Sequence, residues 1–187
     1  MRSATDFSTD HTLSLQYNRP TGLSPTPNGR TATEDLVQRE EPRLPKSETE
    51  TIARAVFAEI AKRFPSLTMV ENFGDPVEIS ITMPVQPGLS QEVWLCLQNY
   101  DELGFRAGHF YNEWFPCTKS TRAEDYLHAV TGFLSGQHRI LEHYRGGKCY
   151  RAQLQKSEGD RWRTIATWAT IWIPLSFRKS VKELRNQ

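Results

Sequence analysis

Residues 91 to 116, QEVWLCLQNYDELGFRAGHFYNEWFP, constrain the fold of this chain more than any other stretch. From Val93 to Leu97 aliphatic residues alternate with other side chains, which is typical of a strand with one aliphatic face. The turn formers Asn99 to Glu102 follow, and a second alternating run begins at Leu103. We therefore predict two paired strands joined by one turn and ending in aromatic residues.

The second run predicts which side chains share a face of this hairpin. A single unbroken strand from residue 103 to residue 111 has glycines on one face and mainly apolar side chains on the other. Gly104 and Gly108 would leave room there for a bulge, a packed element or a ligand. The residues expected on the apolar face are Leu103, Phe105, Ala107, His109 and Tyr111.

Two amphipathic helices flank the strands. Ser47 and Glu50 have capping-box spacing before a stripe of apolar residues that Pro65 ends. Thr121 and Glu124 repeat this spacing before a second stripe that ends at Gly136.

The last third of the chain predicts further strands. The pair Gly146-Gly147 favours a tight hairpin. Residues 161 to 173 alternate over an unusual length, so we expect a bend or a split of this strand near Thr167 to Ala169. After Pro174, Ser176 is a candidate cap for a short basic helix. We predict an α+β domain at residues 47 to 187: a mostly antiparallel sheet of six to eight strands, two main helices packed on one face, and a short C-terminal helix.

Residues 1 to 46 differ in composition from the rest. They hold five of the eleven prolines among Ser, Thr, Asn and Gly, with few large apolar residues. Such a segment buries too little surface to offset its ordering entropy, so we predict a disordered leader. Its acidic and basic residues balance, which argues against a basic arm for nucleic acid.

Overall charge and cysteine content limit the classes of function. The formal net charge is +1, which indicates no whole-protein attraction to polyanions. The three cysteines are widely spaced, and no stretch resembles a signal peptide or a membrane span. We therefore expect a cytoplasmic protein without membrane attachment.

Motifs for chemistry are absent. No His-x-x-x-His, Cys-x-x-Cys or phosphate-binding glycine loop occurs, so we expect no metal and no cofactor. Cys117 is the candidate nucleophile of a cysteine hydrolase, because it precedes a helix start, and His109 is a candidate partner. No glycine-rich oxyanion elbow adjoins Cys117, and we expect no enzymatic activity.

Two binding surfaces remain. Aromatic residues are dense at the end of the hairpin, where Tyr111, Glu113 and Trp114 are candidates for contacts with a protein partner, with packing under the second helix as the alternative. Residues 139 to 163 hold seven basic residues against three acidic ones, with aromatics between them. Solubilising charge is the ordinary explanation, and nucleic-acid binding is the alternative. The candidates for that alternative are Arg145, Lys148, Arg151, Arg161, Trp162 and Arg163.

Residues 77 to 155 resemble small uncharacterised bacterial α+β proteins. The matching pieces are Asp101-Glu102-Leu103, Gly108-His109-Phe110, the helix from Thr121 and Gly146-Gly147. Some of those proteins resemble immunity proteins of polymorphic-toxin systems, which neutralise a toxin by binding it. The resemblance implies a protein-binding module, with an immunity-type toxin antagonist as one form of it, and no catalytic residue.

Overall fold

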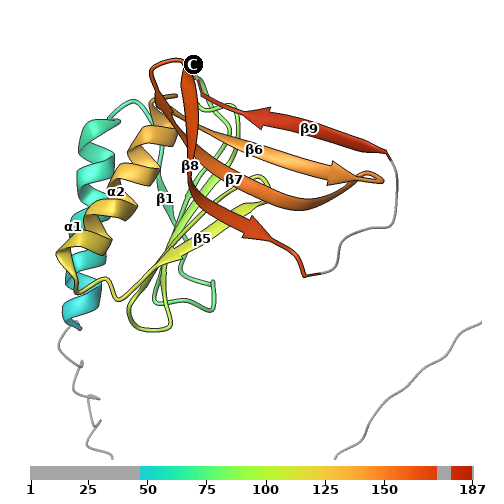
Figure 1. Ribbon diagram of the computed structural model, residues 1–187. Helices are drawn as coiled ribbons and strands as arrows, with labels where there is room; N and C mark the ends of the chain where they lie inside the picture. Colours follow the sequence, from blue (N-terminus) through green and yellow to red (C-terminus); the bar gives the residue numbers. More distant parts are fainter. Residues whose placement is uncertain (1–46, 172–177, 187) are drawn as a thin grey trace, which may run out of the picture. The chain divides into compact units, whose positions relative to one another are not determined.

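The computed structural model describes residues 47–171 and 178–186. These residues form an α+β fold with two helices and two antiparallel sheets (Figure 1). The predicted class is therefore confirmed, whereas the single sheet of six to eight strands is wrong. The predicted leader, residues 1–46, lies outside the described residues.

The first helix begins and ends where the sequence predicts. Helix α1 spans Glu48–Arg63, and the Ser47 hydroxyl accepts a hydrogen bond from the Glu50 backbone N–H at 3.2 Å. Pro65 follows immediately after the cap residue Phe64. Because the helix is amphipathic, its apolar stripe joins the core, in which Ala53, Phe57 and Ile60 are buried.

The first sheet contains five strands in chain order, each antiparallel to the next. The predicted hairpin is a meander of three strands, because the chain reverses again at Gly108, whose φ is +57°. That conformation suits glycine, which has no Cβ to clash. The strands are β1 (Val70–Glu71), β2 (Ile79–Met83), β3 (Val93–Gln98), β4 (Glu102–Ala107) and β5 (Phe110–Trp114).

This second reversal changes which aromatic residues face the core. Phe110 is buried and its ring meets that of Phe105 edge to face, with centroids 5.6 Å apart. Tyr111 pairs with Arg106 instead and lies on the opposite, outer face. The predicted placement of Tyr111 on the face of Phe105 is therefore wrong.

Helix α2, Ser120–Leu134, packs on β4 and β5. Its cap residue is Lys119, which makes no side-chain cap, so the predicted capping box at Thr121 is wrong. Gly136 follows the helix end with φ +72°, as predicted. The buried Tyr126 hydroxyl donates to the Gly104 carbonyl at 3.1 Å and ties the helix to β4.

The second sheet has the order β8-β7-β6-β9, and all its neighbours are antiparallel. The predicted hairpin at Gly146-Gly147 is confirmed, because both residues have positive φ and join β6 to β7. The strand expected over residues 161 to 173 ends at Ala169, before Thr170 and Ile171. Its register shift lies at Ile165, opposite Leu154/Gln155, and not at the predicted Thr167 to Ala169. The strands are β6 (His138–Arg145), β7 (Lys148–Glu158), β8 (Arg161–Ala169) and β9 (Lys179–Leu184).

Strand β9 replaces the predicted C-terminal helix. Residues 179–184 pair with the edge of β6, and Leu184 enters the core opposite Ile140. An unpaired edge of β6 would leave backbone groups without partners, and pairing satisfies them. Tertiary pairing therefore overrides local helical spacing here, while Ser176 lies outside the described residues.

The two sheets share one core. Strand β5 contacts β7 and β8, and inner residues of both sheets join one buried cluster with α1 and α2. Helix α2 contacts inner side chains, as in the Phe133–Phe105 pair at 5.7 Å. Because the described helices pack on this inner side, the outer face of each sheet is free of helix cover (Figure 1).

Candidate functional site

The outer face of the first sheet holds a group of polar and aromatic side chains that we call the acidic face. Cross-strand pairing places Trp94 beside Arg106 and Arg106 beside Tyr111, while Gln98 lies opposite Glu102. This follows from the two-residue period of strands, which directs alternate side chains to opposite faces. The acidic face comprises Asp75, Glu78, Trp94, Gln98, Glu102, Arg106, Tyr111 and Glu113.

Hydrogen bonds hold the centre of the acidic face in place. One carboxylate oxygen of Glu113 accepts from the Tyr111 hydroxyl and from the Gln98 amide, each at 2.7 Å. The Glu102 carboxylate accepts from the side-chain amide of Asn99 at 2.8 Å. These contacts fix side chains that would otherwise lose rotamer freedom on binding.

Two aromatic residues of the acidic face lie beside each other, and a cation lies over one of them. The guanidinium of Arg106 lies 4.9 Å from the Trp94 ring centroid, and the Trp94 and Tyr111 rings are 6.3 Å apart. The indole N–H of Trp94 donates to the Ser80 hydroxyl at 2.9 Å, and Ser80 in turn donates to Asp75. The hydrogen bond of its indole N–H and the guanidinium over its ring together fix the orientation of the Trp94 side chain.

The chemistry of the acidic face favours recognition. Burial raises the pKa of the Cys96 thiol to about 12, and burial together with the bond to Glu113 raises the pKa of Tyr111. Neither group ionises near neutral pH, so neither is an activated nucleophile. The acidic face holds one cation, Arg106, and four carboxylates. Its electrostatic potential is therefore negative. The carboxylates are those of Asp75, Glu78, Glu102 and Glu113.

The three residues predicted for a protein partner separate in the structure. Tyr111 and Glu113 lie together on the acidic face, whereas Trp114 faces the core side, edge to face with Tyr126 at 5.5 Å. Trp114 therefore packs against the second helix, which was the alternative to binding a partner. Trp94 and Arg106 were not predicted, although alternation along residues 93 to 98 places Trp94 off the aliphatic face.

His109 belongs to a different cluster, at the turn between β4 and β5. Glu142 of β6 is 1% exposed, and its carboxylate accepts from the His109 backbone N–H at 2.7 Å and the Tyr144 hydroxyl at 2.6 Å. The His109 ring lies 3.1 Å from the same carboxylate. Burial raises the pKa of Glu142, but these hydrogen bonds outweigh it and leave the pKa below its ordinary value. The cluster joins the two sheets.

The candidate nucleophile Cys117 lies away from His109. Cys117 follows β5, whereas His109 precedes it, so a five-residue strand separates them. Cys117 is 1% exposed, and burial raises the pKa of its thiol, contrary to the expected lowering by the helix. The geometry brings no histidine base to this thiol among the contacts of the described residues.

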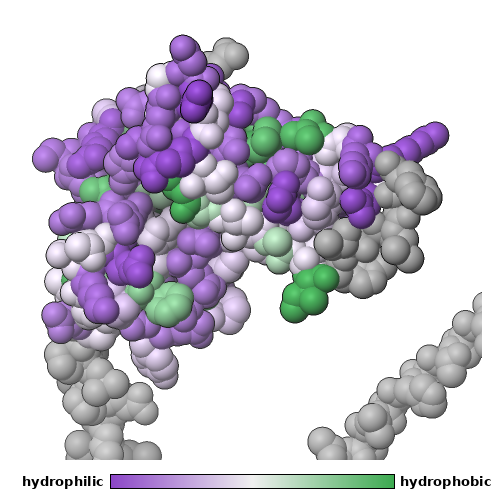
Figure 2. Space-filling view, in the orientation of Figure 1, coloured by the Kyte–Doolittle hydropathy of each residue, from purple (hydrophilic) through white to green (hydrophobic). Residues whose placement is uncertain are grey.

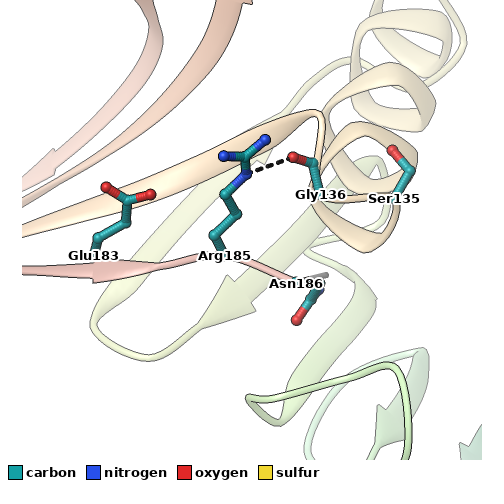
Figure 3. Close-up of a pocket in the computed structure, with 5 residues that line it drawn as sticks. All are labelled: Ser135, Gly136, Glu183, Arg185 and Asn186. Atoms are coloured by element: carbon teal, nitrogen blue, oxygen red, sulfur yellow. Dashed lines mark hydrogen bonds between the residues drawn. The ribbon is translucent and has the colours of Figure 1, made fainter.

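A hollow of about 610 Å³ lies where β9 ends against the end of α2 (Figure 3). The Arg185 Nε donates to the Gly136 carbonyl at 2.8 Å, and the Asn186 amide donates to the Phe133 carbonyl at 3.1 Å. Glu183 pairs with Arg139 at 2.8 Å. These side chains anchor β9 to the helix end, which is a structural role.

The side of the molecule that displays α2 and β8 is mostly hydrophilic, with small separate apolar patches (Figure 2). No group of three or more His, Cys, Asp or Glu within residues 47–171 and 178–186 is arranged to hold a metal ion. None of the described helices is long and apolar enough to cross a membrane.

Comparisons with known proteins add no identity: no family model, no curated protein and no solved structure matches this chain.

Proposed function

We propose that this chain is a non-enzymatic protein-binding module whose acidic face docks on a basic surface of its partner. The observation that carries the proposal is the fixed arrangement of Trp94 and Tyr111 among carboxylates on a face that the described helices leave uncovered. Tryptophan and tyrosine dominate the energetics of protein interfaces, and side chains already held in place lose less entropy on binding.

The charge of the acidic face determines the kind of partner. Carboxylates around an aromatic centre speed encounter with a basic surface and repel acidic competitors. The specific form that we propose is an immunity-type toxin antagonist, which the resemblance at Gly108-His109-Phe110 and Gly146-Gly147 suggests. Such an antagonist holds its toxin in a tight stoichiometric complex.

We also propose a cytoplasmic location. Cys96, Cys117 and Cys149 are all free in the structure, which fits a reducing compartment.

Replacing Tyr111 should weaken the complex. The partner would be recovered from source cells with immobilised wild-type chain, and its stoichiometry and Kd would then be measured by titration calorimetry. Tyr111→Ala removes a central anchor, and interface hot spots of this kind cost about 2 kcal/mol or more, so we expect a loss of about 30-fold or more.

Tyr150→Ala is the matched control, because Tyr150 is a half-buried tyrosine of the other sheet. It should bind as the wild type does. Recovery of no stoichiometric protein partner, or equal losses in the two variants, would contradict the proposal.

A further inference from the structure

The outer face of the second sheet carries the opposite charge to the acidic face, and we call it the basic face. The registers of β6, β7, β8 and β9 place alternate side chains of all four strands on this side. On it, basic residues outnumber the acidic Glu183. Those basic residues are Arg139, Arg145, Lys148, Arg151 and Lys179.

Pairing shows which predicted basic residues belong together. Arg145 lies opposite Lys148, and Arg151 lies opposite His143, all on the basic face. Arg163 lies opposite Lys156, and Lys156 lies opposite His138, which is buried on the inner face of the sheet. Residues opposite each other share a face, so Arg163 lies on the inner side and not on the basic face. Arg163 also forms an ion pair with Glu158 at 2.6 Å. Arg161 and Arg163, which the sequence grouped with the nucleic-acid candidates, therefore do not lie on the basic face.

Aromatic rings lie between the cations of the basic face. The Arg139 guanidinium is 4.2 Å from the Trp162 ring centroid, and that of Arg185 is 5.2 Å from it. The Arg145 guanidinium is 5.6 Å from the Tyr150 ring, and the His143 ring is 6.3 Å from the same tyrosine. Stacked arginines are held in place by the rings.

Two arginines of this face have no side-chain acceptor among the residues that the structure describes. The Nε atoms of Arg145 and Arg151 are buried without a hydrogen-bond partner, and neither side chain forms an ion pair with any described residue. A guanidinium binds phosphate oxygens well, because its donors match their geometry. A ligand that brings phosphates would supply acceptors to the other N–H groups of these two guanidiniums.

We propose that the basic face binds single-stranded nucleic acid. Phosphates would contact Arg145, Arg151 and Lys179, and unpaired bases would stack on Tyr150 and on the arginine and tryptophan surface. A four-stranded sheet face with half-buried rings between its cations suits unstacked bases, whereas duplex grooves admit a helix or a two-stranded ribbon. This surface is separate from the acidic face, so the failure of either proposal leaves the other unaffected.

Fluorescence anisotropy with labelled oligonucleotides tests the proposal. The probes are mixed-sequence RNA and DNA strands of about 12 nucleotides, within the usual site size. A DNA duplex of that sequence and an abasic strand of that length complete the set. The single strands should bind more tightly than the duplex and the abasic strand. Arg145→Ala with Arg151→Ala should weaken binding about 10-fold or more and reduce the slope of log affinity against log salt by about 1.4.

Arg161→Ala with Arg163→Ala removes the same charge from the opposite side and should have a much smaller effect. The double variant Arg145→Lys with Arg151→Lys keeps both charges but loses the planar donor fork of the guanidinium, so it should also weaken binding. It provides a second measurement if the alanine variant does not fold. Absence of binding, equal losses in the two alanine variants, or equal affinity for the abasic strand, the mark of a polyanion effect alone, would overturn the proposal.

Discussion

Gly108→Ala should lower the free energy of unfolding by about 2 to 5 kcal/mol, the sum of a left-handed backbone penalty of about 1 to 2 kcal/mol and an overpacking penalty of about 1 to 3 kcal/mol. Gly108 has φ +57°, and a Cβ there would lie 2.5 Å from both a Glu142 carboxylate oxygen and the Leu184 Cδ1. Those atoms end flexible side chains, but both side chains are buried and Glu142 is held by hydrogen bonds, so neither yields easily.

Gly147→Ala is the matched control for this variant. Gly147 has φ +79°, and nothing lies within 4 Å of its added Cβ. It therefore incurs only the backbone penalty of about 1 to 2 kcal/mol. Urea unfolding followed by circular dichroism would measure both variants, and equal losses would show that the contact with Glu142 does not constrain the turn.

Glu142→Ala should lower the free energy of unfolding by about 2 to 4 kcal/mol. The change leaves the His109 N–H and the Tyr144 hydroxyl without their acceptor at the junction of the two sheets. Glu142→Gln retains one carbonyl oxygen and nearly the same volume, so it should lose less.

The pH dependence of stability in the wild type and in Glu142→Gln tests the ionisation of Glu142. Because the pKa of Glu142 is below its ordinary value in the folded state, its ionised form adds stability above the pKa of an unfolded glutamate, about 4.3. That contribution is lost as the pH falls through the lower, folded-state pKa. The stability difference between wild type and Glu142→Gln should therefore be constant above about pH 5 and shrink below about pH 4. A difference that grows on acidification would contradict this assignment.

Local signals in the sequence were sufficient for the presence of both helices and for the turn at Gly146-Gly147. The Ser47 cap, the stop before Pro65 and the Gly146-Gly147 hairpin depend on residues close in sequence, and all were predicted correctly. The turn at Gly108 was missed because the alternating pattern continues through it. Strand β9 was missed because its reason is an unpaired edge of β6, far away in the chain.

The candidate site was predictable only in part, for the same reason. Tyr111 and Glu113 were identified from aromatic density, but the sequence does not show that Trp94 and Arg106 stand beside them, because the register of β3 and β4 decides it. Trp114 was grouped with Tyr111 although strand alternation separates residues of odd spacing. Arg161 and Arg163 were grouped with Arg145 by proximity in sequence, whereas the sheet sends them to the other side.

Oxidative footprinting of aromatic side chains tests most directly whether the acidic face is the partner surface. The chain would be exposed to hydroxyl radicals alone and in the purified complex with its protein partner, and oxidation would be quantified residue by residue by mass spectrometry. We predict that the partner protects Trp94 and Tyr111 and leaves Trp162 and Tyr150 as reactive as in the free chain. Protection of Trp162 and Tyr150 with unchanged reactivity at Trp94 and Tyr111 would contradict it.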